Sequence, residues 1–148
     1  MKPRLVLGLG NPLMGDDGAG ARVTEMLARD STVTDRAEVL TAGTDVLRSM
    51  ERIDGREHVI LVDAVECGDK PGRISVLDEP LFEERQEYAH SLSAAQAVEL
   101  MRSAMPGLRG TKFTWVLVHV APVKASEGLS ADVAAAVPVA ATVVKGLP

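Results

Sequence analysis

Hydrophobic and polar residues follow two different periods along the chain. Short apolar runs typical of strands cover residues 4–9, 37–42, 59–65 and 113–120. Between these runs, apolar residues recur at helical spacing, as Val23, Met26 and Leu27 do in the first such segment. An alternation of strands with helices favours a mainly parallel sheet that helices cover on both faces.

The remaining elements complete an α/β fold class. We expect helices over about 18–29, 46–53 and 93–104, and a last helix from Ser130. A turn at 69–72 connects the 59–65 run to a strand at 74–77, and this connection is too short for a parallel crossover. The sequence therefore predicts one domain over 1–148, a three-layer α/β/α sandwich. Its mixed sheet has about five strands, all parallel except the one at 74–77.

A glycine-rich loop over residues 8–20, GLGNPLMGDDGAG, connects the first strand to the first helix. It is not a dinucleotide-binding fingerprint, because Leu13 stands where that motif needs glycine, and it has no Gly-Lys-Ser/Thr of a P-loop. Asp16 and Asp17 stand where the strand leads into the helix, at the sheet edge where α/β proteins bind ligands. A helix cap would account for one of these carboxylates. The second carboxylate and the glycines around it indicate that this edge of the sheet has a function.

Three residues lie where this topology places reactive groups: Asp17 in the first loop, Asp63 near the end of the most apolar strand, and His90 before the third helix. Asp63 has apolar neighbours in sequence, so its carboxylate needs a partner or access to solvent. Two carboxylates and an imidazole suit zinc, nickel or a similar ion. The same set could also act without metal, as paired acids or a His–Asp couple.

Other candidates are weaker. His58 precedes its strand and should lie at the opposite edge, while His119 could approach the site or be a half-buried histidine with a hydrogen-bond partner. Cys67 is the only cysteine, with no histidine or second cysteine close in sequence to suggest thiolate catalysis. The chain has neither G-x-S-x-G nor H-E-x-x-H, which excludes the common serine hydrolases and the zincins.

Composition limits the partners. The net charge is −5 and no basic run interrupts it, so we expect no nucleic-acid or anionic-membrane ligand. No apolar stretch reaches the ~18 residues that span a bilayer. The first residues have no signal-peptide pattern, and a single cysteine fits a reducing compartment, so we expect a cytoplasmic protein.

These motifs, in this order, resemble the hydrogenase maturation endopeptidases, along essentially the whole chain. The glycine-rich loop carries the longest motif. The shorter ones are Ala-Gly-Thr at 42–44, Val-Asp-Ala at 62–64, Pro-Gly at 71–72, His-Ser-Leu at 90–92 and Gly-Leu-Ser at 128–130. The resemblance implies a phosphorylase/hydrolase-like fold.

The resemblance also implies a function. The family removes the C-terminal extension of the nickel–iron hydrogenase large subunit after nickel insertion, so the expected partner is that precursor. The family's metal-contacting residues carry over onto Asp17, Asp63 and His90, the catalytic and metal candidates of an aspartic-type endopeptidase. The first ligand is Glu in some members, and Asp17 is one methylene shorter. The nickel is expected to come with the substrate, with no tightly bound cofactor.

Two other functions fit part of the pattern. Peptidyl-tRNA hydrolases share a strand followed by Gly-Leu-Gly-Asn-Pro, but their pattern needs an early histidine and further asparagines. Here the first histidine is His58 and the only asparagine is Asn11, and the acidic charge opposes a tRNA ligand. A nickel-sensing chaperone would use the same ligands and cleave nothing. The oligomeric state stays open.

Overall fold

The computed structural model describes residues 1–66, 70–78, 92–122 and 128–148. Its strands are β1 (Arg4–Leu9), β2 (Ala37–Gly43), β3 (His58–Glu66), β4 (Ile74–Asp78) and β5 (Lys112–Val120). Its α-helices are α1 (Ala19–Ala28), α2 (Ser31–Thr34), α3 (Met50–Ile53), α5 (Leu92–Ala104) and α6 (Ala131–Gly146). Short 3₁₀ turns are η1 (Gly15–Gly18), η2 (Val46–Ser49) and η4 (Pro106–Leu108).

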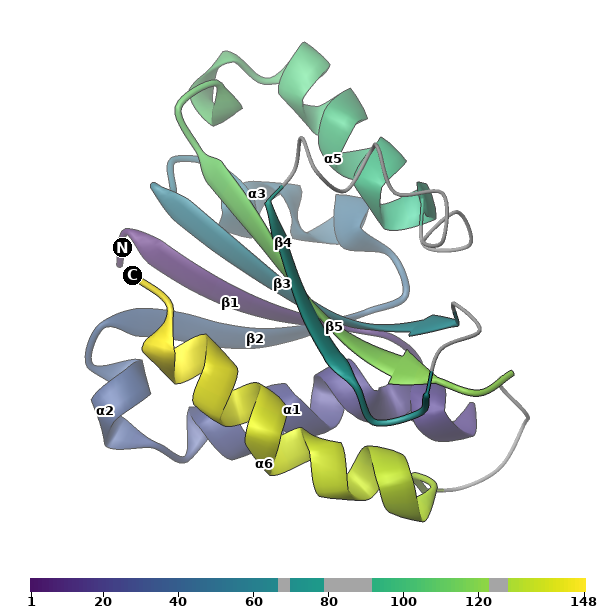
Figure 1. Ribbon diagram of the computed structural model, residues 1–148. Coiled ribbons are helices and arrows are strands. Elements are labelled where there is room, and N and C mark those ends of the chain that lie inside the picture. Colours follow the sequence, from purple (N-terminus) through teal and green to yellow (C-terminus); the bar gives the residue numbers. More distant parts are fainter. Residues whose placement is uncertain (67–69, 79–91, 123–127) are drawn as a thin grey trace.

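The strands form one five-stranded sheet in the order β2-β1-β3-β5-β4 (Figure 1). Strands β2, β1, β3 and β5 pair in parallel, and β4 pairs antiparallel with β5. The predicted α/β class, the strand number and the antiparallel Ile74 strand are therefore confirmed. Because β1 and β3 are parallel neighbours, the loops that follow them leave the sheet at the same edge.

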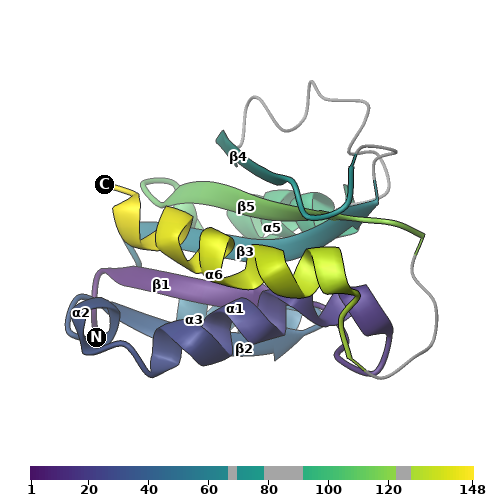
Figure 2. The same ribbon diagram turned by 60° about the horizontal axis from the view of Figure 1, so that its bottom comes forward.

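Helices cover both faces of the sheet and make two separate cores. Helices α1 and α6 lie on one face, and α3 and α5 lie on the other (Figures 1 and 2). Alternate residues of each strand face opposite sides, so Ile60 and Val62 belong to the α1/α6 core. Val59 and Leu61 belong to the other core. A central strand buried on both faces reads as a continuous apolar run, which explains why β3 is predictable.

The first helix lies unusually close to the strand ends. A Cβ atom added at Gly20 would lie 2.4 Å from the carbonyl oxygen of Leu9 and 2.4 Å from that of Val62. Both atoms belong to the backbone, so neither can move aside without displacing a strand. Gly20 therefore lets the first turn of α1 lie directly on the carboxyl ends of β1 and β3.

Two helical segments differ from the pattern. The predicted 46–53 helix consists of the 3₁₀ turn η2 followed by α3, and Asp45 caps η2 by accepting a hydrogen bond from Leu47 N at 3.0 Å. Helix α2 was not anticipated, and it begins after Asp30, whose carboxylate accepts from Thr32 N. Helix α2 is a single turn, too short to show a helical period, so only its capping residue signals it.

Among the helices that the structure describes, none has the length and apolar character needed to cross a bilayer.

The close contact at Gly20 predicts a large effect of one methyl group. We expect Gly20→Ala to lower the free energy of unfolding by about 2–3 kcal/mol, as overpacking against rigid backbone does. Chemical denaturation followed by circular dichroism measures this change. Gly146→Ala is the matched control: it lies at the end of α6 with no atom within 4 Å of its added Cβ, so stability should stay equal or rise slightly. An equal change in the free energy of unfolding of the two variants would show that the close contact at Gly20 does not limit the side chain at this position.

Candidate functional site

Asp17 and Asp63 lie at the carboxyl edge of the sheet, on neighbouring parallel strands. Asp17 belongs to η1, which follows β1, and Asp63 stands one residue beyond the last β1–β3 register pair, Gly8 with Val62. The two residues therefore lie at one edge of the sheet, as the sequence predicts from the parallel order of these strands. Both residues are partly exposed.

The loop that carries Asp17 folds back on itself. Asn11 N donates to the Oδ2 atom of Asp17 at 2.7 Å, and Leu13 N donates to Asn11 Oδ1 at 3.0 Å. Gly10 has a positive φ of 115°, and a Cβ atom there would lie 1.9 Å from the carbonyl oxygen of Asp17. The Asp17 carboxylate is thus held by the loop backbone at one oxygen.

Asp63 is a carboxylate in the second half of β3, between the apolar residues Val62 and Ala64. Burial, together with the smaller effect of the nearby negative charge of Asp17, raises the pKa of Asp63 to about 7. A hydrogen bond from Ala64 N to Asp63 Oδ1, at 2.8 Å, acts in the opposite direction. The two aspartates are therefore close enough for their charges to interact, and a bound cation would relieve both the repulsion and the burial of charge.

The third predicted site residue, His90, lies outside the described residues, and so does Cys67. Within 1–66, 70–78, 92–122 and 128–148, no group of three or more His, Cys, Asp or Glu side chains is placed to hold a metal ion. The described part of the site is thus a pair of carboxylates, and the metal assignment of Asp17, Asp63 and His90 stays a prediction.

Asp16, the neighbour of Asp17, has a different role. Its Oδ1 accepts from Ser130 N at 2.7 Å and its Oδ2 is 2.8 Å from Ser130 Oγ. Ser130 is the N-cap residue of α6, so Asp16 connects the site loop to the start of the last helix. Sequence reasoning missed this pair, because the two residues are 114 positions apart and no local pattern connects them.

The two remaining histidines have partners of their own. His58 lies at the start of β3, with its Nε2 2.8 Å from Thr114 Oγ1, which confirms that it is away from the site edge. His119 is buried near the end of β5, and its Nε2 lies 2.6 Å from Ser75 Oγ. The interpretation of His119 as a buried histidine with a hydrogen-bond partner fits this geometry.

The raised pKa of Asp63 predicts how stability depends on pH. Between the ordinary pKa of 3.8 and about 7, the folded protein holds a proton that the unfolded chain releases, so stability rises as pH falls through 7. Asp63→Asn keeps an acceptor for Ala64 N and removes the charge. We expect this variant to melt at least about 3 °C higher than the parent at pH 8 and equally at pH 4, measured with a chelator present.

A surface aspartate controls for charge alone. Asp35→Asn removes an equal charge at an exposed position far along the chain from the site, and its melting temperature should follow the parent at both pH values. If Asp63→Asn melts with the parent at pH 8, the carboxylate is not destabilised by its surroundings.

Comparisons with known proteins give related sequences and folds. The family model for hydrogenase maturation protease matches residues 21–146. The HupD hydrogenase expression/formation protein of Bradyrhizobium diazoefficiens is 36% identical over 73 residues, which cover 49% of this chain and 38% of that protein. The chain thus matches less than two thirds of the length of this relative.

Two solved structures match over nearly their whole length. The [NiFe] hydrogenase maturation protease HybD from Thermococcus kodakarensis has a TM-score of 0.81 and 28% identity, covering 98% of this chain and 97% of that one. The hydrogenase maturating endopeptidase HybD from Escherichia coli has a TM-score of 0.78 and 27% identity, covering 97% and 90%. The match of the family model over most of the chain, together with these folds, shows that the chain belongs to the hydrogenase maturation protease family.

Proposed function

We propose that this protein is an endopeptidase that removes the C-terminal extension of a nickel–iron hydrogenase large-subunit precursor after nickel has been inserted. Membership of the hydrogenase maturation protease family supports a proteolytic role on a hydrogenase protein. The observation that carries the proposal is the pair of aspartates, Asp17 and Asp63, at the carboxyl edge of the sheet.

The carboxylate pair supports recognition of a metal carried by the substrate. Asp17 and Asp63 are close enough to repel each other, and a cation between them would lower the energy of both. His90 adds an imidazole in this proposal, and carboxylate and imidazole ligands together suit a nickel ion. Three such ligands leave open coordination positions, so a nickel ion already held by the precursor could be contacted.

The loop geometry supports a fixed position for this contact. Asp17 is held by Asn11 N, and the neighbouring Asp16 is held by Ser130, so the η1 turn is attached at two points. A preorganised carboxylate loses little conformational freedom when it meets a ligand. The nickel is in this view part of the substrate, and no resident cofactor is required.

A reducing compartment fits the proposed partner. The chain has a single cysteine, Cys67, which rules out an internal disulfide. We therefore include a cytoplasmic site of action in the proposal.

The decisive experiment uses two forms of one precursor. Purified protein is incubated with nickel-loaded and with nickel-free large-subunit precursor of identical sequence, and loss of the tail is followed by intact-mass spectrometry. We expect cleavage of the nickel-loaded form alone, with at least about tenfold slower cleavage without nickel, since each lost ligand contact of ~1.4 kcal/mol costs that factor.

The other outcomes separate the alternatives. Equal cleavage of both forms would leave a protease without nickel recognition. Binding of the loaded precursor without any cleavage would favour the nickel-sensing chaperone. Cleavage that appears only after zinc is added to the protein would indicate an ordinary metalloprotease.

His90 gives the test of the site itself. His90→Ala should lose processing of the nickel-loaded precursor while the far-ultraviolet circular dichroism spectrum stays that of the parent. The physical reason is that the imidazole completes the ligand set with Asp17 and Asp63 in the proposal. His58→Gln is the matched control, because His58 lies at the opposite edge of the sheet, and it should process normally. Full processing by His90→Ala would remove this residue from the site.

A further inference from the structure

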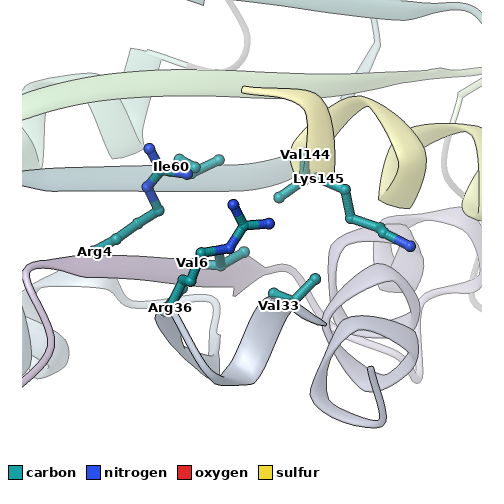
Figure 3. A pocket seen from close by; sticks show the side chains of 8 residues that line it. Arg4, Val6, Val33, Arg36, Ile60, Val144 and Lys145 are labelled. Atoms are coloured by element: carbon teal, nitrogen blue, oxygen red, sulfur yellow. The ribbon is translucent and has the colours of Figure 1, made fainter. Parts of the chain in front are cut away.

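A small cavity lies at the end of the sheet opposite to the two site aspartates. It is about 20 Å³ in volume and opens to solvent. Arg4 and Ala37, which begin β1 and β2, place it at the amino-terminal edge of the sheet, and Figure 3 shows the side chains that line it. Its apolar wall comes from both sheet and helices, and its charged residues come from three separate segments. The lining residues are Arg4, Val6, Val33, Arg36, Ala37, Ile60, Val144 and Lys145.

The three cations of this cavity are not equivalent. Lys145 Nζ lies 2.8 Å from the Oδ2 atom of Asp30, and hydrogen bonds from Lys145 and Thr32 lower the pKa of Asp30 to about 2. The charge of Lys145 is therefore balanced by an ionised carboxylate. In Figure 3 its amino group also points away from the two guanidinium groups.

The positive charges of Arg4 and Arg36 are not balanced by a carboxylate of the described residues in this way. Arg4 donates from Nη1 to the carbonyl oxygen of Leu147 at 3.2 Å, and Arg36 donates from Nε to that of Thr32 at 3.2 Å. Both acceptors are neutral, and no carboxylate of the described residues lies within ion-pair distance of either guanidinium. Figure 3 shows both side chains directed into the same space beside Val6 and Ile60. Two unbalanced cations thus converge on one cavity.

The shape and the lining of the cavity restrict what could occupy it. A guanidinium has five N–H donors in a planar fork that matches a carboxylate, and Arg4 and Arg36 each use one donor on a neutral acceptor. The wall formed by Val6, Ile60 and Val144 is apolar and favours a methyl group over an all-polar anion. A volume of about 20 Å³ holds one group of water or methyl size, so only the methyl end of a small anion could enter it, and the charged end would lie at the open mouth between the guanidinium groups.

We propose that this cavity is a binding site for a short-chain carboxylate of acetate size, with the carboxylate between Arg4 and Arg36 and the methyl group against Val6, Ile60 and Val144. The bound anion neutralises two cations that otherwise repel each other. The site is separate from the carboxyl edge, so it does not depend on the proposed protease function.

The test is a titration of the ¹⁵N-labelled protein with acetate, followed by amide chemical shifts. We expect saturable shifts at Val6, Ile60 and Val144, with a Kd of about 1 mM, a value in keeping with a ligand of four heavy atoms. Acetamide has the same shape without the charge and should give no saturable shift. Inorganic phosphate has the charge without the methyl group and should bind more weakly than acetate.

Single substitutions locate the site. Arg36→Gln should weaken acetate binding at least about tenfold, because it removes one charge-assisted donor pair. Arg36 is exposed and precedes β2, so this variant should keep the fold, and Arg4→Gln should weaken binding similarly. Arg48→Gln is the matched control: this arginine follows the opposite, carboxyl end of β2, and binding should be unchanged.

Four results would overturn the proposal. Acetate could give no saturable shift at these amides, or acetamide could bind as well as acetate, which would show that the guanidinium groups hold no anion. Stronger binding of phosphate than of acetate would show that the site binds a different class of anion. Unchanged acetate affinity in Arg36→Gln would place the binding elsewhere.

Discussion

Helix α1 can begin where it does because Gly20 has no side chain. The backbone of this residue lies against the carbonyl oxygens of Leu9 and Val62, so helix and strand ends meet without any side-chain layer between them. This contact fixes the length and path of the preceding loop, in which Gly10 takes a positive φ and passes close to Asp17. Asp17 lies in the turn that follows this loop, and Asp63 lies on the neighbouring strand, one residue beyond its last pair with β1.

The two ends of the parallel sheet differ in charge. At the carboxyl edge, Asp17 and Asp63 are negative groups whose proximity and burial raise the pKa of Asp63. At the amino edge, Arg4 and Arg36 are positive groups with neutral partners. Charges left without an opposite partner in a fold reduce its stability, and sites that bind ligands commonly contain them. The two ends of the sheet thus carry clusters of opposite charge.

The local pattern of apolar and polar residues is sufficient to predict most of the strands and helices. The strands were predictable because each is a run of apolar residues, and β4 was expected to be antiparallel because the 69–72 connection is too short to cross over. Helix α2 has no sequence signal beyond its cap, because one helical turn has no period to detect, whereas the 46–53 segment is helical as its spacing predicts but begins as a 3₁₀ turn. For the site, the expected parallel order of the first and third strands is enough to place Asp17 and Asp63 at one edge of the sheet.

The sequence by itself determined the α/β class, the mostly parallel sheet and the edge that carries the two aspartates, since these depend on local periodicity and on how parallel strands are connected. Only the tertiary structure decided which partners the two neighbouring aspartates of the first loop have. Asp16 and Asp17 are adjacent and chemically identical, yet Asp16 accepts hydrogen bonds from Ser130 at the start of α6, while Asp17 accepts one from Asn11 N and lies close enough to Asp63 for their charges to interact. It also decided that Arg4 and Arg36 share a cavity. Contacts between residues far apart in the chain depend on the packing of whole elements, and no local pattern records them.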